Sequence, residues 1–431
     1  MSSVLRRLWW LEPACLFAVV MGSTMLAAWA QSDSTYRLYG TPKYVEGHHV
    51  LLAASAIAVF ALGRQFAMAT GRVPEATPQQ ADRLIRFWFW LTTGLTLFGY
   101  AVWLVIAIKN GFSLGLLHEF VTTHDPVRAD TMFEEMFVNV KGVTTCTQFG
   151  VAAVPLGLWL FFNGQRRYVR GALLLLVAIA AARAIVLHER LAVVELIVPG
   201  AVILIRACVM GRSVSPMTRA GLQLAPVLGV ISLVLFFGGF EYFRSWRYYQ
   251  DKFDSYAEFT LWRVGGYYTT AHNNGAMALE TQGSFPIPFA TFRQLWTVPG
   301  LDETRIGYYQ LTGADPVKEY DNMLIRFGTP ELNNEGGLFQ PVRDFGIPGY
   351  LLFWFIFGFA AGRIYRHFLV GTLAGLTLYP LVFLAILELP RFLYLSYTRS
   401  FPALVTLAIV LWLVRRAPSP EQVTGVVQVA H

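Results

Sequence analysis

Residues 221–240 have the sequence GLQLAPVLGVISLVLFFGGF, which contains no charged side chain. The hydrocarbon core of a bilayer is about 30 Å thick, and roughly twenty apolar residues in an α-helix cross it. The sixteen residues that follow, EYFRSWRYYQDKFDSY, are dense in aromatic and charged side chains. Such a change in composition is typical of a helix leaving the membrane. The second stretch fits an aromatic belt at the membrane surface, and an amphipathic helix lying along that surface is the alternative interpretation.

The whole chain has the composition of a membrane protein. Of its 431 residues, 55% are hydrophobic and 14% are charged, whereas soluble domains carry about 25% charged residues. Ten apolar runs are long enough to span a bilayer and are bounded by charge, glycine or proline. They cover residues 10–30, 50–69, 84–108, 145–162, 171–187, 191–210, 221–240, 345–365, 368–387 and 398–414. The sequence therefore predicts an all-α integral membrane protein with about ten transmembrane helices.

Arginines gather in alternate loops and at the helix ends beside them. They are Arg6, Arg7, Arg64, Arg72, Arg83, Arg86, Arg166, Arg167, Arg170, Arg206, Arg212, Arg219, Arg363, Arg366, Arg415 and Arg416. Cytoplasmic loops are enriched in Lys and Arg, and the other set of loops holds most of the acidic residues. We therefore expect both termini in the cytoplasm and one large extracytoplasmic loop, residues 241–344, between the seventh and eighth helices.

The predicted organisation has four parts. Residues 1–240 hold seven helices with a smaller outer loop near 109–144, residues 241–344 form the large loop, residues 345–415 hold three helices, and residues 416–431 are a cytoplasmic tail. The first run has a second interpretation as a signal peptide, because arginines precede it and residues 28–30 resemble a cleavage site. That run is long for a signal peptide, and cleavage would leave the other nine helices oriented as before.

The formal net charge of +7 does not point to nucleic acid. The basic residues lie in short clusters between apolar runs, where they face anionic membrane lipid. The three cysteines lack the paired spacing of a zinc or redox motif. The sequence also contains neither a carboxylate cluster for a divalent ion nor a glycine-rich phosphate loop with its lysine. We therefore expect membrane lipid as a partner, and no metal, cofactor or nucleic acid.

Charges within apolar runs are costly and mark candidate sites. In ARAIVLHERLAVVEL, residues 182–196, Arg183 and Glu195 lie six residues either side of Glu189. If the turn at Glu189 joins two antiparallel helices, Arg183 and Glu195 lie at similar depth and pair. Such a pair either only holds the helices together, or Arg183 and Arg190 belong to an anion site, because guanidinium groups bind diphosphates in bidentate fashion.

The long outer segment carries a second group of candidates, which combines a cation, an imidazole, amides and aromatic rings. They are Arg263, Tyr267, Tyr268, His272, Asn273 and Asn274. Amides and tyrosines suit sugar hydroxyls and pyranose faces, and a histidine can act as acid or base near neutral pH. A solvated loop histidine is the alternative. Residues 321–349 add Arg326, Asn333, Asn334, Arg343 and Asp344 among glycines and prolines that predict tight turns.

The order of these features resembles the bacterial oligosaccharide repeat-unit polymerases, also called O-antigen polymerases or Wzy. The motifs that carry the resemblance are HERLAVVE at 188–195, AHNNG at 271–275, PELNNEGG at 330–337 and RDFGIPG at 343–349. Some members of the family have outer-loop motifs in which an arginine precedes a glycine by eleven positions. Arg326 and Gly337 fit that spacing, but the chain has no second clear copy. The motifs cover about forty residues, and the architecture covers most of the chain.

The resemblance implies transfer of a growing glycan from undecaprenyl diphosphate to another lipid-linked repeat unit, on the outer face of a bacterial inner membrane. Arg183, Arg190, Arg263 and Arg343 would contact the diphosphate or glycan, and His272, Glu189 or Asp344 would activate the acceptor hydroxyl. A chain-length regulator and a flippase would be partners. The reaction needs no metal, because the diphosphate is a good leaving group and arginines can stabilise its developing charge.

Three other functions remain open from the sequence. An O-antigen ligase uses the same donor, and AHNN is similar to an element of its outer loop. A polyprenyl-phosphate-sugar glycosyltransferase usually has an acidic pair in its first outer loop, whereas residues 31–49 hold only isolated Asp33 and Glu46. A flippase or other transporter predicts a polar path through several helices, and strong charges inside the predicted spans are confined largely to Arg183 and Glu195.

Overall fold

The computed structural model describes residues 5, 7–70, 82–113, 115–116, 135–140, 142–187, 189–210, 215–298, 300–301 and 304–416. Within these residues the secondary structure is helical and contains no strand, which confirms the all-α class. Several predicted features lie outside them. These are Arg6, Arg72, Arg212, His188, most of the smaller outer loop and the tail after Arg416.

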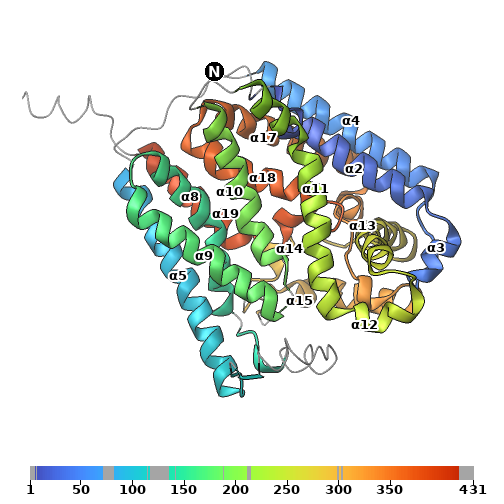
Figure 1. Ribbon diagram of the computed structural model, residues 1–431. Coiled ribbons are helices and arrows are strands. Elements are labelled where there is room, and N and C mark those ends of the chain that lie inside the picture. The colour runs from blue at the N-terminus through green and yellow to red at the C-terminus, as the bar shows by residue number, and fades with distance from the viewer. Residues whose placement is uncertain are drawn as a thin grey trace, which may run out of the picture.

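Within the described ranges, eight helical segments are long and apolar enough to cross a membrane. They are α2 (Pro13–Ala30), α4 (Gly47–Ala69), α5 (Asp82–Lys109), η3 (Thr144–Phe149) with α8 (Gly150–Phe162), α9 (Arg166–Leu187), α10 (Leu191–Met210), α11 (Pro216–Arg244) and α17 (Gln340–Val370). The two remaining predicted runs correspond to α18 (Leu373–Glu388) and α19 (Phe401–Arg416), which have 16 residues each. Figure 1 shows these helices packed as a bundle, as expected of a membrane-embedded protein.

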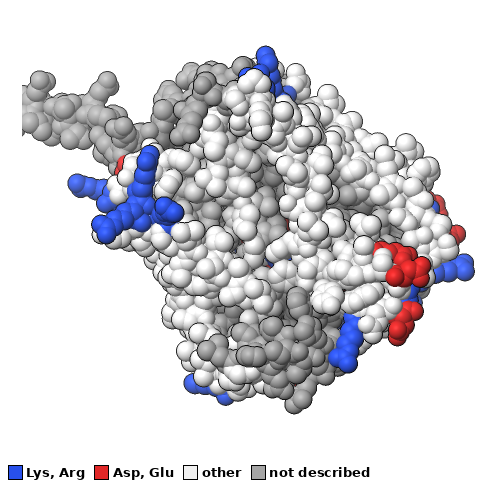
Figure 2. Space-filling view, viewed as in Figure 1, with Lys and Arg blue, Asp and Glu red and all other residues white. Residues whose placement is uncertain are grey.

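The exposed surface of α11 explains why this chain needs a bilayer. None of its most apolar window is buried inside the protein, and Leu224, Val230 and Leu235 are all exposed. Large contiguous apolar surfaces are rare on soluble monomers. On the face seen in Figure 2, charged side chains lie towards the edges and leave a broad uncharged band across the middle. That band is the surface that lipid would cover.

Local sequence signals set the helix ends. Ser215 precedes Pro216, and its hydroxyl accepts a hydrogen bond from the Thr218 backbone N–H at 3.1 Å, because the first N–H groups of a helix lack partners. At the other end of the chain, Gly371 adopts a left-handed conformation with φ 89° and ends α17. This is the usual role of glycine at a helix C-terminus.

Small residues bring α4 and α17 into close contact. A Cβ atom added at Gly63 or Gly358 would overlap backbone atoms of the facing helix. Small residues at such positions allow helix backbones to approach closely, as membrane helices often do. This contact holds the N-terminal helices against α17, whose first turns carry the RDFGIPG motif.

The segment predicted as a large outer loop contains a buried helix, α13 (Tyr256–Thr281). Figure 1 shows α13 nearly end-on beside α2 and α11, and it packs against both helices and α16 (Pro316–Phe327). The segment EYFRSWRYYQDKFDSY is not one surface helix. Instead it forms the end of α11, then α12 (Trp246–Tyr249) and η4 (Gln250–Lys252), before α13 begins. The short helices α14 (Arg293–Trp296), α15 (Tyr308–Thr312) and η5 (Pro330–Leu332) follow.

Candidate functional site: a neutralised arginine cluster and a polar pocket

The predicted ion pair between Arg183 and Glu195 is wrong. Arg183 pairs with Glu189 in the turn between α9 and α10, and its guanidinium lies 4.4 Å from the Trp103 ring centroid. Glu195 faces the segment before α19, where Arg399 donates to its two oxygens at 3.0 and 3.1 Å. A similar depth in the membrane is therefore not enough to make Arg183 and Glu195 an ion pair, because their side chains point to different neighbouring elements. Arg399 also lies 3.5 Å from Glu189, which connects the two pairs.

A second set of pairs joins α10, α11 and α13. Arg190 Nη2 lies 3.0 Å from Glu241 Oε1, and Arg263 Nε lies 3.2 Å from the other oxygen of Glu241. Arg263 also bonds Glu331 at 2.6 Å, and Arg190 donates to the Tyr267 hydroxyl at 3.2 Å. Glu241 and Arg263 are 0% and 1% exposed. The turn between α9 and α10 therefore lies on the same side of the molecule as the late segment.

We call the ion-paired residues around these helices the paired cluster. It consists of Arg183, Arg190, Arg263, Arg391 and Arg399 with Glu189, Glu195, Glu241, Glu331 and Glu388. Five arginines face five glutamates, so the formal charges cancel. Buried charges need such partners because desolvation is expensive. The cluster thus supplies little net positive charge for a diphosphate, contrary to the role expected of Arg183, Arg190 and Arg263.

The predicted sugar-binding amides on α13 hold neighbouring loops. Asn273 accepts from the Tyr44 backbone N–H at 2.6 Å, and its amide donates to the Pro42 carbonyl at 2.8 Å. Asn274 donates to the carbonyls of Leu332 and Asn334 at 2.7 and 3.0 Å. Both side chains are buried. Their hydrogen-bonding groups are therefore engaged by backbone, and we assign them a structural role.

His272 is neither a solvated loop residue nor an accessible base. It is 0% exposed on α13, and Nε2 lies 2.9 Å from the Thr24 hydroxyl. Burial lowers the pKa of His272 to about 3, because the interior disfavours the charged imidazolium. The ring is therefore neutral at pH 7, inside the bundle.

The carboxylates of Asp344 and Glu189 also have hydrogen-bond or ion-pair partners within the protein. The Asp344 side chain accepts three backbone N–H groups, from Phe289 at 2.8 Å, Ala290 at 3.0 Å and Thr291 at 2.6 Å. Carboxylates that accept several such bonds are stabilised in the charged form and hold loops in place. The three predicted catalytic groups lie in three different environments and do not form one site. We therefore withdraw Asp344 as a candidate base.

The remaining predicted binding residues are dispersed. Tyr267 is buried among the arginines of the paired cluster, and Tyr268 is partly buried beside it on α13. Arg326 and Asn333 are exposed, and Asn334 is partly exposed. Gly337 is buried, and a Cβ atom added to it would overlap the Leu393 backbone nitrogen. The spacing between Arg326 and Gly337 therefore does not bring them into one recognition element.

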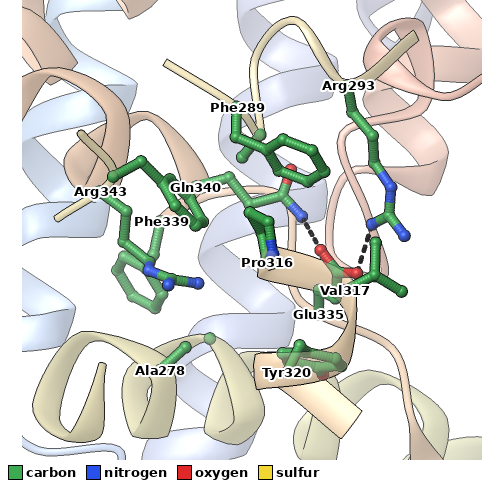
Figure 3. Close-up of a pocket in the computed structure, with 13 residues that line it drawn as sticks. Ala278, Phe289, Arg293, Pro316, Val317, Tyr320, Glu335, Phe339, Gln340 and Arg343 are labelled. Carbon is green, nitrogen blue, oxygen red and sulfur yellow. Dashed lines mark hydrogen bonds and ion pairs between the residues drawn. The ribbon is translucent and has the colours of Figure 1, made fainter. Parts of the chain in front are cut away.

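A polar pocket lies where α13, α16 and the start of α17 meet residues 283–297, and we call it the Glu335 pocket (Figure 3). Its lining residues are Gly275, Ala278, Phe285, Phe289, Ala290, Arg293, Pro316, Val317, Tyr320, Glu335, Phe339, Gln340 and Arg343. Its empty volume, including the space at the mouth, is about 420 Å³. That figure includes space open to solvent; the enclosed cavity is about 20 Å³, which has room for about one water molecule, so a ligand the size of a sugar would sit at the mouth.

The charged groups of the Glu335 pocket are not fully paired. Glu335 forms an ion pair with Arg293 and accepts from the Gln340 amide at 2.9 Å. Arg343 lies across the pocket from Glu335 (Figure 3), with its guanidinium 4.0 Å from the Phe285 ring centroid. Within the described part of the chain, Arg343 makes no ion pair, and Nε lies 3.5 Å from the Gly283 carbonyl. Two arginines and one glutamate leave the pocket a formal charge of +1.

Sequence reasoning identified Arg343 but missed its neighbours. Glu335 was inside the motif PELNNEGG, although only the asparagines were selected. Arg293, Tyr320 and Gln340 belong to no motif, and Arg391 and Arg399 lie in a short connection between helices. The spacing of these residues along the chain carries no signal, because tertiary contacts alone bring them together.

One group of possible metal ligands lies elsewhere. His48, His49 and Glu280 place their ligand atoms within 4.8 Å of one another. However, His49 Nδ1 accepts the Glu46 backbone N–H at 3.2 Å in a helix cap. A neutral ring with this bond carries its proton on Nε2, the atom directed at Glu280. The arrangement therefore suits a hydrogen-bonded cap rather than a cation site.

No model of a known protein family matches this chain, and comparisons with curated proteins and with solved structures find no significant similarity.

Proposed function

We propose that this protein is a membrane-embedded glycosyltransferase that polymerises oligosaccharides linked to polyprenyl diphosphate. It would lie in a bacterial inner membrane, with ten transmembrane helices, cytoplasmic termini and an active site on the outer face. The observation that carries the proposal is the Glu335 pocket. It joins Arg343, which forms no ion pair with any described carboxylate, to the partly accessible carboxylate of Glu335 at the border of the apolar bundle. A lipid-linked glycan requires both a membrane and a polar pocket at its edge.

The pocket has the chemistry that glycan transfer from a diphosphate requires. As the glycosyl bond breaks, negative charge grows on the departing diphosphate, and a nearby guanidinium lowers the energy of that state. Arg343 suits this role because none of the carboxylates in the described part of the chain forms an ion pair with it. Glu335, Asp344 and Glu319 act on it only at longer range. The paired cluster then acts as the scaffold that joins α9, α10 and α11 to α13, rather than as the diphosphate site.

The arrangement of the basic helix ends supports the orientation. Arg363 and Arg366 donate to the carbonyl of Thr70, at 3.1 and 2.7 Å, at the end of α4. Arg206 donates to the Phe368 carbonyl at 2.6 Å, at the end of α17. Arg343 and Glu335 lie before or at the opposite end of α17. Because Lys and Arg favour cytoplasmic helix ends, the pocket would face outward.

The proposal is tested by adding a polyprenyl-diphosphate-linked repeat unit to the purified protein in lipid nanodiscs and separating the products on a gel. Wild-type protein should give a ladder of lengths. Arg343→Ala should lower the rate about 100-fold or more, as removal of one oxyanion-stabilising group does in a serine protease. Lys318→Ala, which removes an exposed cation on α16 outside the pocket, is the matched control.

Each result decides a different point. Absence of any product from wild-type protein would contradict the proposed activity. A single transfer without a ladder would indicate a ligase, and movement of the labelled lipid across a liposome membrane without elongation would indicate a flippase. A complete ladder from Arg343→Ala would remove that arginine from the site.

A further inference from the structure

The backbone after Glu335 is held rigidly. Gly336 has φ 65°, and its N–H donates to the Arg391 carbonyl at 2.9 Å. The Gly337 N–H donates to the Leu389 carbonyl at 3.0 Å. Added Cβ atoms at these glycines would overlap backbone atoms of Ala271 and Leu393. The two glycines therefore allow this turn to pack closely between α13 and the segment after α18. This packing fixes the backbone position of Glu335.

The Glu335 carboxylate is oriented without being saturated. Arg293 binds one oxygen and Gln340 binds the other at 2.9 Å. Arg293 is itself held by the Tyr397 hydroxyl at 3.0 Å, with its guanidinium 4.6 Å from that ring's centroid. The Tyr397 hydroxyl also hydrogen-bonds the Glu335 carboxylate. An ionised carboxylate has about four acceptor positions, so one of them remains for a ligand. The Glu335 side chain is 19% exposed and can therefore contact a ligand.

The walls of the pocket suit a sugar ring. Phe285, Phe289, Phe339 and Tyr320 supply aromatic surface, while Glu335 and Arg343 supply an acceptor and a cation on opposite sides (Figure 3). A pyranose presents an apolar face for a ring to cover and hydroxyl groups at its edge. Ligand pockets commonly combine such apolar walls with a few placed polar groups.

We propose that the Glu335 pocket binds the acceptor sugar of a lipid-linked glycan and that Glu335 is the general base of the transfer. This inference rests on the proposed function. The Glu335 carboxylate removes the proton of the acceptor hydroxyl as that oxygen forms a bond to the donor's anomeric carbon. The bond from this carbon to the diphosphate breaks, and its electron pair leaves with the diphosphate oxygen. The protonated Glu335 then releases its proton to water.

The other carboxylates do not fit this role. Asp344 is bound by three backbone N–H groups and does not line the pocket. Glu189 lies between Arg183 and Arg399, also outside the pocket. Glu335 is the carboxylate that lines the pocket in the described part of the chain. Arg293 and Gln340 act as positioning residues, because they hold the Glu335 carboxylate.

The first test compares Glu335→Gln with wild type in the nanodisc assay. A general base contributes about 10²- to 10⁴-fold to rate, so kcat should fall at least about 100-fold while KM for the lipid-linked unit changes only a few-fold. Asp321→Asn is the control, because Asp321 is exposed on α16 and does not line the pocket. A kcat for Glu335→Gln within about threefold of wild type would overturn the inference and leave the proposed function intact.

A second pair of variants tests the pocket without touching its ion pair. Val317 lines the mouth and is 39% exposed, whereas the neighbouring Lys318 is exposed outside the pocket. Val317→Trp should raise KM for the acceptor about tenfold or more without changing thermal unfolding, because the indole blocks entry. Lys318→Trp should behave as wild type. Equal activity of the two tryptophan variants would overturn the inference even if Glu335→Gln failed to fold. Wild-type protein that forms no product would instead refute the proposed function, and this inference with it.

Discussion

The paired cluster and the Glu335 pocket use the same residue types for different purposes. In the paired cluster, five arginines meet five glutamates, and Arg263 and Glu241 are almost completely buried. In the pocket, Arg343 has no carboxylate partner among the described residues, and Glu335 keeps access to the pocket. An arginine near a membrane surface is therefore an anion site only where no carboxylate has already neutralised it.

The comparison also explains why arginine placement alone was misleading. Arg183 and Arg190 were predicted to bind an anion because guanidinium groups bind phosphates well, and the family resemblance added Arg263. The glutamate partners of Arg190 and Arg263 come from elements that the spacing does not connect, namely the end of α11 and the turn before α17. Burial then favours pairing over ligand binding, since an unpaired buried charge is very unfavourable.

The largest expected effect is a difference in stability between arginine variants of the two regions. Arg263→Ala leaves buried Glu241 with one arginine fewer and frees Glu331, so the free energy of unfolding should fall by about 3–5 kcal/mol. Arg343→Ala leaves no ion-paired carboxylate behind and should lower the free energy of unfolding by less than about 1 kcal/mol. Denaturant unfolding of the purified proteins in detergent measures both. Equal losses would mean that the two arginines do not differ in the proposed way.

An intermediate effect is expected at the edge of the pocket. Asp344→Asn replaces a carboxylate that accepts three backbone N–H groups, and the new amide NH₂ meets one of these donors. Hydrogen bonds to charged groups contribute about 1.5–3 kcal/mol, so the free energy of unfolding should fall by about that amount. Asp321→Asn, on the exposed face of α16, is the control. An unchanged stability, combined with lost activity, would restore Asp344 as a catalytic candidate.

The smallest effect concerns His272, on the helix that borders both regions. Its pKa is lowered by burial to about 3, whereas an unfolded histidine has a pKa near 6.5. Between these two pKa values, the unfolded state binds more protons than the folded state. The stability contributed by the neutral, buried His272 is therefore complete above about pH 6.5 and is lost as pH falls towards 3. At pH 5 the loss is about 2 kcal/mol.

Thermal unfolding at pH 7 and pH 5 measures this dependence. His272→Gln can keep a hydrogen bond to Thr24 but does not titrate, so the difference between the two pH values should shrink relative to wild type. His48→Gln, which changes a half-exposed histidine, controls for the loss of any imidazole. A pH dependence unchanged by His272→Gln would show that protonation of other groups destabilises the fold.

Part of the pocket was visible in the sequence. The motif RDFGIPG drew attention to Arg343, and PELNNEGG contained Glu335 and the two glycines that fix its backbone. The choice of the asparagines in that motif was less successful, because Asn334 offers its backbone carbonyl to Asn274. A glycine pair directly after an acidic residue was the better signal, since it indicates a backbone position with little room.

The sequence by itself determined the class of this protein, because apolar runs of about twenty residues have one low-energy arrangement in a bilayer, namely helices that satisfy their own backbone hydrogen bonds. Each of the ten runs lies largely within a helical segment, although the run 368–387 begins in α17 and continues in α18. The tertiary structure alone decided which charges meet. Ion pairs depend on side-chain directions and on contacts between elements up to about 200 residues apart, such as Glu195 and Arg399. Local periodicity contains no information about those distances.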